Sequence, residues 1–349
     1  MERINTYEQW LALEGLPVIK DYSILDLMTV PLKPWARKGG LGTYINLIGS
    51  EGVIDAYLCE IPPGGSLLPQ KHLFEETIYI LSGYGASTIW TEGGAKQTFE
   101  WQEGSLFAPP LNSWHQHFNG QSDKPVRYIG VTRAPVFMNL FHDLDFIFHN
   151  DFVFKKRYQG EGDYFSSRGT IHPERIWESN FIADCRAFKL LEWQGRGAGG
   201  TNIFFELSNN IQSAHISEFP VGTYKKAHRH GPGAHIVVLG GQGYSLIWPE
   251  GGKRIKIDWR ENSLFVPPAM WFHQHFNTGK EPARYLAVHA SLSFKYQGIQ
   301  KNYEADKDIK AGGIQIEYQD EDPAIRKLFK EELAKNGAPW GMSKFFPGE

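Results

Sequence analysis

The sequence predicts an all-β protein made of two copies of one barrel-like domain, followed by a C-terminal helix. The chain has 349 residues, enough for two domains that each bury a core. Short β-branched and aromatic runs are interrupted by many of the 37 Gly and 20 Pro residues, a texture typical of antiparallel β-proteins. The third and strongest observation is that the second half of the chain repeats the first.

The repeat becomes visible when the chain is shifted by 158 positions, so that Trp35 falls on Trp193. No gap is needed until just after Asn119. Chance does not produce so many matches, so we interpret the chain as a duplication with repeats over about 35–133 and 193–290. Further matches are Gly42 with Gly200, Thr43 with Thr201, Pro62 with Pro220, Gly64 with Gly222, His72 with His230, Trp90 with Trp248, Trp101 with Trp259, His115 with His273 and His117 with His275.

The elements before the second barrel follow from this repeat. Residues 1–34 form an arm, and the first barrel covers 35–133. Residues 134–192 link it to the second barrel. Within this linker the segment 137–154 is rich in Phe, and we expect it to pack on a barrel.

Within each repeat the pattern predicts strands joined by tight turns. The runs 77–81 and 236–239 are rich in β-branched and aromatic residues, and each stops at a glycine. The Glu-Gly-Gly triplets at 92–94 and 250–252 predict hairpin turns, because Gly supplies the positive φ that such turns need. Strands at this spacing indicate a sandwich or a barrel.

The second barrel is placed at 193–295, and a tail of 296–349 follows it. The tail contains the one helix that the sequence predicts clearly. Asp322 is suited to the N-cap and Pro323 to the first turn, and the helix is expected to end near Asn336 and Gly337.

Composition excludes several classes of protein. Hydrophobic residues make up 41% and charged residues 21%, which is typical of a globular domain, and the net charge of −3 argues against nucleic acid as a partner. Cys59 and Cys185 are far apart, so a disulfide framework is not expected and a reducing, cytoplasmic location is the simplest interpretation. Neither a secretory leader nor a run of ~20 apolar residues is evident, so no membrane association is expected.

Three histidines in the second repeat predict a metal site. His228 and His230 are two residues apart, so on a strand both side chains face the same side. A later strand is expected to bring His273 beside them, and three converging imidazoles suit a divalent transition metal. The residues stand in two ordered motifs: Gly222, five residues, His228-Arg229-His230, and then Pro268, four residues, His273, three residues, Asn277.

These two motifs, in this order and spacing, are similar to those of the cupin superfamily. The resemblance covers both repeats, a little over half of the chain. It implies two tandem cupin barrels, each a double-stranded β-helix or jelly roll, with a small-molecule substrate bound inside. Cupin barrels leave open sheet edges that commonly pair, so we expect at least a homodimer. The arm could cover such an edge with its apolar residues Tyr7, Trp10, Leu11 and Leu13.

The ligand set of the second repeat departs from the four-ligand cupins. Family members usually carry a Glu after the second His, where this chain has Ala234. The local pattern resembles the three-histidine sites of gentisate- and salicylate-type ring-cleaving dioxygenases. This resemblance implies Fe(II) first, with Mn(II), Ni(II) or Zn(II) as alternatives, and a dioxygenase acting on a small aromatic acid or phenol. Gentisate-type bicupins, however, carry the metal in their first cupin, whereas the complete histidine set here is in the second.

Two other functions stay open at this point. One is a Mn- or Fe-dependent decarboxylase or isomerase of the cupin type, which would release carbon dioxide without oxygen uptake in the decarboxylase case. The other is a non-catalytic bicupin that binds a metal or a ligand and shows no turnover. Oxygen uptake coupled to substrate loss would distinguish the dioxygenase from both.

Several residues near the histidines have two interpretations. His275 lies two residues past His273, so it either contacts substrate as a catalytic, orienting group or packs behind the ligands. His235 is expected on the opposite face, although a bulge would make it a fourth ligand. The basic residues Lys225, Lys226 and Arg229 either attract an anionic substrate or form a solvated strand edge.

The first repeat carries a different set at the same positions. Two histidines and one carboxylate, His72, His115 and Glu76, can hold Fe(II), Mn or Zn, with Gln70 as a weak oxygen ligand. The alternative is a decayed site that keeps only its structure. Core or sheet packing, rather than substrate stacking, is expected of the repeated tryptophans Trp90, Trp101, Trp248 and Trp259.

Overall fold

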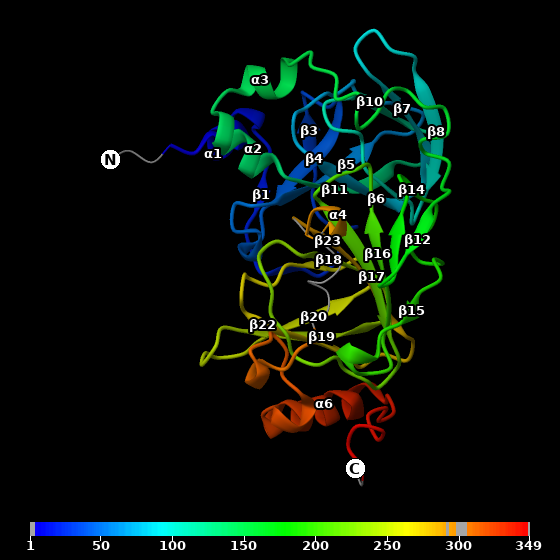
Figure 1. Ribbon diagram of the computed structural model, residues 1–349. Coiled ribbons are helices and arrows are strands. Elements are labelled where there is room, and N and C mark those ends of the chain that lie inside the picture. Colours follow the sequence, from blue (N-terminus) through cyan, green and yellow to red (C-terminus); the bar gives the residue numbers. More distant parts are fainter. Residues whose placement is uncertain (1–3, 291–292, 298–305, 348–349) are drawn as a thin grey trace.

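A computed structural model of the chain describes residues 4–290, 293–297 and 306–347. Two β-barrels are stacked along the long axis of the molecule, with the C-terminal helix at the far end of the second barrel (Figure 1). Within the described ranges, no helix is long and apolar enough to cross a membrane.

The first barrel is built from two sheets. Its larger sheet has the order β1-β4-β5-β11-β6-β9-β14, with β3 paired to β4, and its smaller sheet has the order β10-β7-β8. The strands are β1 (Val18–Ile19), β3 (Lys33–Trp35), β4 (Gly40–Ile45), β5 (Asp55–Ile61), β6 (Glu76–Ser82), β7 (Tyr84–Trp90), β8 (Gln97–Gln102), β9 (Leu106–Phe107), β10 (Trp114–Asn119), β11 (Val126–Thr132) and β14 (Phe181–Ile182).

The second barrel repeats this plan. Its larger sheet has the order β12-β13-β16-β17-β23-β18-β21-β2, with β15 paired to β16, and its smaller sheet has the order β20-β19-β22. The strands are β2 (Ser23–Ile24), β12 (Thr170–His172), β13 (Ile176–Glu178), β15 (Leu191–Glu192), β16 (Thr201–Glu206), β17 (Ser213–Phe219), β18 (His235–Gly240), β19 (Gln242–Trp248), β20 (Ile255–Arg260), β21 (Leu264–Phe265), β22 (Phe272–Asn277) and β23 (Ala283–His289).

The structure corrects the gap-free alignment of the repeats at β4 and β16. Leu41 pairs with Glu60, whereas Thr201 pairs with Glu218, the repeat equivalent of Glu60. Leu41 is therefore the structural counterpart of Thr201, and the match of Thr43 with Thr201 is wrong. The turn before β16 is longer than the turn before β4, and the connection after β16 is shorter, so the two differences cancel in the sequence.

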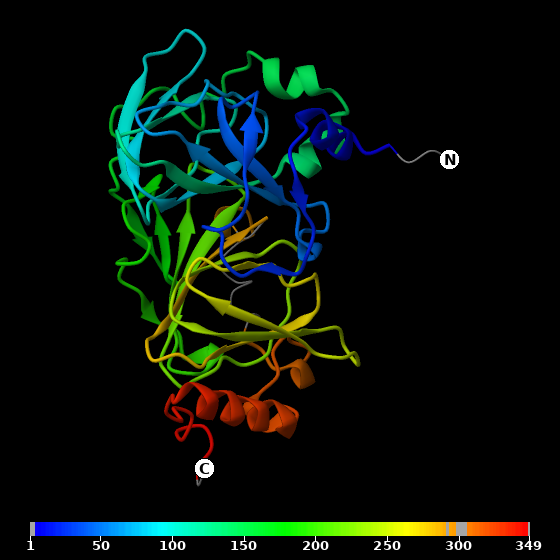
Figure 2. The same cartoon turned by 180° about the vertical axis from the view of Figure 1, so that it is seen from behind.

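The two barrels exchange short strands. β2 belongs to the N-terminal arm, yet it pairs with β21 of the second barrel, where Ser23 lies opposite Phe265. β14 belongs to the linker and pairs with β9 of the first barrel, where Phe181 lies opposite Phe107. Seen from behind, the arm reaches down to the strands of the second barrel (Figure 2). The larger sheets also share one apolar core, which includes Leu58, Ile129, Phe205, Ile216, Val237 and Leu286.

Helices cover both ends of the molecule. In the Phe-rich part of the linker, which we expected to pack on a barrel, α2 and α3 form and bury Met138 and Ile147 in the core of the first barrel. The helices are α1 (Thr6–Glu14), α2 (Ala134–Phe141), α3 (Leu144–His149), α4 (Phe294–Gln297) and α6 (Pro323–Asn336), with short 3-10 turns at Ile48–Ser50, Gln194–Arg196, Ile309–Ala311 and Tyr318–Asp320.

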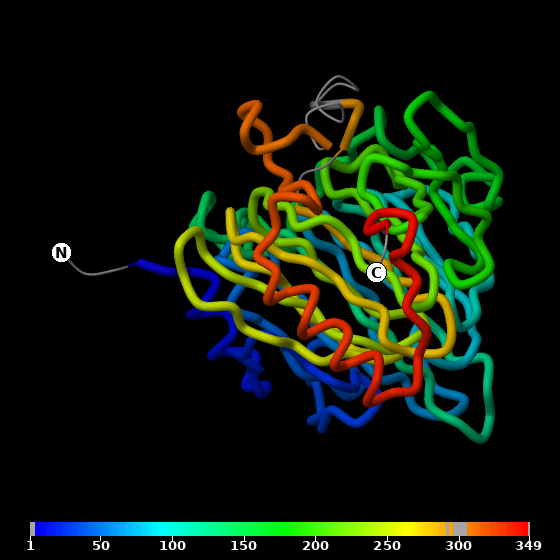
Figure 3. The backbone as a smooth tube through the Cα atoms, turned by 90° about the horizontal axis from the view of Figure 1, so that it is seen from below, coloured from blue at the N-terminus to red at the C-terminus, as the bar shows by residue number. Residues whose placement is uncertain are grey.

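The predicted C-terminal helix is confirmed as α6. The side chain of Asp322 accepts a hydrogen bond from the backbone of Ala324, and Gly337 ends the helix in the left-handed conformation. Viewed from below, α6 lies across the smaller sheet of the second barrel (Figure 3). Phe329 is buried there, in contact with the rings of both Tyr224 and Phe276.

Candidate metal centres

Each barrel brings three potential metal ligands together. The ligand atoms of His228, His230 and His273 all lie within 4.8 Å of one another, and so do those of His72, Glu76 and His115. These are the groups that the sequence predicts for the two repeats, apart from Gln70.

Backbone pairing places the ligands at the same point of each barrel. His228 and His273 exchange backbone hydrogen bonds of 3.1 and 2.8 Å. Gln70 and His115 exchange bonds of 2.8 and 2.9 Å at the equivalent place in the first barrel. The fold therefore presents the first and third ligand positions side by side in both barrels, although Gln70 occupies the first position in one of them.

In the second barrel, hydrogen bonds fix the tautomer of all three imidazoles. The Nδ1 atoms of His228, His230 and His273 lie 3.1, 2.9 and 3.3 Å from the carbonyl oxygens of Lys226, Gly231 and Trp271. A carbonyl can only accept, so each Nδ1 carries the proton and each Nε2 keeps a free lone pair. Burial also lowers the pKa of each imidazole, which keeps it neutral. Three neutral Nε2 donors fit a divalent transition metal.

The first barrel prepares its histidines in the same way. Nδ1 of His72 donates to the carbonyl of Phe74 at 2.9 Å, and Nδ1 of His115 to that of Ser113 at 3.2 Å. Both Nε2 atoms face Glu76, whose Oε2 lies 3.1 Å from His72 and 3.6 Å from His115. Two neutral nitrogens and one carboxylate oxygen fit Mn(II), Fe(II) or Zn(II).

Glu76 is ionised although it is buried. Burial opposes the charge, but the positive charge of Lys38 outweighs it and holds the pKa of Glu76 well below its usual range. Nζ of Lys38 lies 3.8 Å from Oε1 of Glu76 and donates to the hydroxyl of Tyr57 at 2.6 Å. The hydroxyl of Tyr57 in turn donates to Glu76. Ligand, cation and phenol thus form one buried cluster.

The side-chain amide of Gln70 is engaged in hydrogen bonds outside the triad. Its amide oxygen accepts from the guanidinium of Arg37, and its amide nitrogen donates to the carbonyls of Arg37, Leu68 and Pro69. Arg37 also pairs with Glu14 of α1 through Nε, at 2.9 and 3.0 Å. Gln70, at the first ligand position of this barrel, therefore binds Arg37, and the guanidinium of Arg37 adds a positive charge beside the triad.

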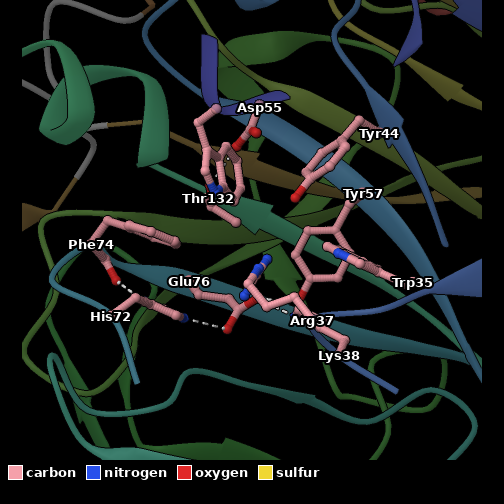
Figure 4. Close-up of a pocket in the computed structure, with 11 residues that line it drawn as sticks. Trp35, Arg37, Lys38, Tyr44, Asp55, Tyr57, His72, Phe74, Glu76 and Thr132 are labelled. Carbon is pink, nitrogen blue, oxygen red and sulfur yellow. Dashed lines mark hydrogen bonds and ion pairs between the residues drawn. The ribbon is translucent and has the colours of Figure 1, made fainter. Parts of the chain in front are cut away.

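A closed pocket lies beside the first triad (Figure 4). It has room for about one water molecule. The labelled side chains of His72, Glu76, Arg37 and Lys38 point into a common space. Trp10 of α1 lines one wall and connects the N-terminal helix to the site. The lining residues are Trp10, Trp35, Arg37, Lys38, Tyr44, Asp55, Tyr57, His72, Phe74, Glu76 and Thr132.

The motifs of the sequence do not indicate the cations and the acid of this pocket, Arg37, Lys38 and Asp55. Asp55 is 1% exposed and accepts from Tyr7 at 2.5 Å and from Thr132. Burial raises its pKa to about 6. A signal for Lys38 was present, because the shift that places Trp35 on Trp193 also places Lys38 on Arg196.

Of the three basic residues near the second triad, Lys225 points into the barrel, whereas Lys226 and Arg229 form ion pairs with acidic residues. Lys225 is 2% exposed, and its amine donates to the hydroxyl of Tyr285 at 3.0 Å inside the barrel. Lys226 pairs with Glu317 at 2.6 Å and Arg229 with Glu250 at 2.7 Å. A solvated strand edge is therefore the wrong interpretation for Lys225.

His275 and His235 lie on different sheets of the second barrel, His275 on β22 and His235 on β18. The ring of His275 is 5.6 Å from that of His273 and 6.3 Å from that of His228, inside the barrel. Nε2 of His235 instead faces the hydroxyl of Ser50 in the first barrel, at 3.4 Å. His235 is not among the three grouped ligands.

Comparison with solved structures identifies the fold. No protein-family model matches the chain, and neither does any curated protein. One similar structure, of an oxalate decarboxylase, is described for its substrate binding mode and a reaction specificity switch; it has 15% identity, a TM-score of 0.52 and 78% coverage of each chain. Another, of the Bacillus subtilis enzyme and concerned with its Mn(II) centres, has 14% identity with the same TM-score and coverage.

These structures are decarboxylases rather than the ring-cleaving dioxygenases that the local resemblance implied. At this level of identity the likeness shows the fold and leaves the reaction to be argued from the site. The expected architecture is confirmed: the chain has the bicupin fold, with a potential metal centre in each of its two tandem cupin barrels.

Proposed function

We propose that this protein is a divalent-metal-dependent enzyme that decarboxylates a small carboxylic acid, with Mn(II) as the leading metal. The observation that carries the proposal is the closed pocket of the first barrel, where His72 and Glu76 of the triad face the half-buried Arg37 and the buried Lys38. The fold is that of Mn(II)-containing oxalate decarboxylase structures, which supports the same choice.

The size of the pocket favours a small substrate. It has room for about one water molecule, so an aromatic acid does not fit without movement of the walls. The aromatic walls themselves are tightly packed, with Trp35 edge-on to Tyr44 and Tyr57 at ring distances of 5.2 Å. A short mono- or dicarboxylate needs the least displacement.

The charge of the pocket favours an anion. Glu14 neutralises Arg37, and Glu76 opposes Lys38. A divalent ion on the triad would therefore leave an excess of positive charge, reduced at most by Asp55. In a buried, poorly hydrated space this excess attracts a carboxylate strongly.

The residues also supply what decarboxylation requires. The bond to the carboxyl carbon breaks, carbon dioxide leaves, and the electron pair left behind takes up a proton. A bound divalent ion would hold the substrate carboxylate and withdraw electron density from it. Lys38 and Arg37 position the anion. Asp55, whose pKa burial raises to about 6, is partly protonated near neutral pH and can deliver the proton.

The test is an assay of Mn(II)-loaded protein with short carboxylic acids, oxalate and malonate among them, that follows carbon dioxide and oxygen together. We expect carbon dioxide release without stoichiometric oxygen uptake. Lys38→Met should lower kcat/KM by about 10- to 100-fold, because it removes a charged hydrogen-bond donor. Lys124→Met, at the surface of the same barrel, is the control. Absence of carbon dioxide with every acid would contradict the proposal.

Ring-cleaving dioxygenation is a second candidate, favoured by the second barrel alone. Its three ligands are neutral, and Ala234, in place of a carboxylate, leaves positions open for a chelating substrate and dioxygen. An oxygen electrode tests this candidate function, with Fe(II)-loaded protein and a panel of catechols, gentisate-like acids and salicylate-like acids. Oxygen uptake with loss of aromatic absorbance would support it, and Ala234→Glu should then weaken the activity.

A further inference from the structure

The same hydrogen-bonded chain of three side chains occurs in both barrels, one step deeper than the metal ligands. A tryptophan on the outer strand of the smaller sheet donates to a serine on the middle strand, which contacts a histidine directly opposite it on the third strand. The members are Trp101, Ser87 and His117 in the first barrel, at 2.8 and 2.6 Å, and Trp259, Ser245 and His275 in the second, at 3.0 and 2.8 Å.

The hydrogen bonds of these three side chains favour one arrangement of protons, because the alternative leaves the serine hydroxyl proton without an acceptor among the described residues. The indole Nε1 of Trp101 carries a hydrogen and can only donate, so Oγ of Ser87 accepts from it. The hydroxyl proton of Ser87 is then free to be donated to Nδ1 of His117. With Nδ1 as acceptor, the single ring proton lies on Nε2.

This arrangement is the reverse of that in the metal ligands. His115 and His273 protonate Nδ1 and offer a lone pair at Nε2, whereas His117 and His275 accept at Nδ1 and offer a hydrogen at Nε2. Each barrel thus places an acceptor-type and a donor-type histidine two residues apart on one strand, with ring centres 5.5 Å apart in the first barrel and 5.6 Å in the second.

The hydrogen offered by His117 has no acceptor in the described part of the chain. Its Nε2 is fully buried and lacks a hydrogen-bond partner. Nδ1 faces the smaller sheet, so Nε2 faces the barrel interior. An unsatisfied buried donor of this kind is destabilising, and a bound acceptor would satisfy it. His275 holds the same position in the second barrel, with its ring 6.3 Å from that of His228, but of the two histidines only His117 has its Nε2 among the unsatisfied buried atoms.

The metal-ligand positions beside these three side chains differ between the two barrels, whereas the three side chains themselves do not. This contrast argues that the three side chains have a role beyond packing. Gln70 stands where the second barrel has His228, and Glu76 where it has Ala234. The tryptophan, serine and histidine are the same in both, with the same bonds.

We propose that Trp101 and Ser87, and Trp259 and Ser245, are positioning residues that hold His117 and His275 as Nε2–H donors to an oxygen of the anion bound beside each triad. The identity of that anion as a carboxylate rests on the proposed function. The tautomer itself does not, because hydrogen bonds within the protein set it.

The first test is nitrogen NMR of the metal-free protein with labelled histidine, in which two-bond couplings distinguish Nε2–H from Nδ1–H rings. We expect Nε2–H at His117 and His275, and Nδ1–H at His273. Ser245→Ala should give a mixed or reversed tautomer at His275, and Ser245→Thr should keep Nε2–H because it retains the hydroxyl. Nδ1–H at His275 in the unmodified protein would overturn the proposal.

The second test is calorimetric binding of oxalate to Mn(II)-loaded protein. Ser245→Ala should weaken binding at the second site by about tenfold, the loss of one hydrogen bond to a charged group, and Ser245→Thr should restore it. Ser217→Ala is the matched control, because Ser217 is equally buried and its hydroxyl has no partner among the described residues. Unchanged tautomer and affinity in Ser245→Ala would overturn the positioning role. If the unmodified protein binds no oxalate, the carboxylate fails as the ligand, while the NMR result still decides the tautomer.

Discussion

The side chains of the two candidate sites have two roles: some are potential metal ligands, and others orient those ligands or determine the charge around them. Each of the five triad histidines directs its Nδ1 to a carbonyl, so the ligand nitrogens are oriented before any ion binds. Such preorganisation reduces the reorganisation that binding requires.

The first prediction concerns the ligands of the second barrel. His273→Ala should abolish tight binding at this site, since two imidazoles are too few to hold a divalent ion, while the first site keeps its ion. Metal analysis after dialysis, together with titration of each site, measures this. His235→Ala is the control, because His235 faces Ser50 on the other side of the sheet. Full metal retention in His273→Ala would rule out the assignment.

The second prediction is a pH dependence due to Asp55. Burial raises its folded pKa to about 6, above the unfolded value of about 3.9. A raised carboxyl pKa means that the folded state binds the proton more tightly, so this group costs stability as pH rises from about 4 to 6 and the cost is complete above 6. The full cost is about 3 kcal/mol.

Urea unfolding between pH 4 and pH 7 measures this cost. Asp55→Asn cannot ionise, so its free energy of unfolding should rise relative to that of the unmodified chain as pH increases. Asp163→Asn, at an exposed position, is the control and should show no such trend. A difference between Asp55→Asn and the unmodified chain that is independent of pH would contradict the shift.

At the scale of elements, the turns and the smaller sheets depend on a few glycines. In the hairpin turns predicted at 92–94 and 250–252, Gly93 and Gly251 have φ of 67° and 71°, as the sequence indicated. A different constraint acts at Gly243 of β19, where a Cβ atom would lie 1.9 Å from the carbonyl oxygen of Phe276 and 2.8 Å from the ring of Trp259.

The third prediction follows from this close approach. Gly243→Ala should lower the free energy of unfolding by about 2–4 kcal/mol, because neither a backbone carbonyl nor a packed tryptophan can move away cheaply. Gly240→Ala, at the end of the preceding strand β18, is the matched control, because the added atom would meet nothing within 4 Å there. Equal stability of the two variants by denaturant unfolding would show that the contact is not limiting.

Much of the fold and of the metal sites could be predicted because both depend on local spacing. The two-residue separation of His228 and His230, the glycine-bounded strands and the capped helix α6 are all short-range patterns. The position of Arg37 at the first pocket could not be predicted in this way, since it depends on contacts with residues far away in the sequence, Gln70 and Glu14 among them. Strand exchange left no local pattern either, because β2 and β14 have two residues each.

For the whole molecule, the fourth prediction is association into at least a dimer. Apolar side chains on the helices at the first barrel remain exposed, with Leu13 at 77%, Leu140 at 66% and Phe141 at 40%. Exposed apolar residues grouped on neighbouring helices indicate an interaction surface. Light scattering at micromolar concentration should give at least twice the mass of one chain. Leu140→Glu should shift the species toward the monomer, with Leu191→Glu, on the second barrel, as the control. A monomeric unmodified protein would refute the prediction.

The exchange of β2 has a consequence for biosynthesis. Residues 23–24 leave the ribosome early, but their pairing partners at 264–265 follow about 240 residues later. At the usual rates of synthesis this is a delay on the order of ten to fifty seconds. During that time the arm carries an unpaired strand next to a first barrel that is itself incomplete until β14 is made. Slower translation of the second half lengthens the exposure, so the yield of native protein should depend on codon usage there more than in the first half.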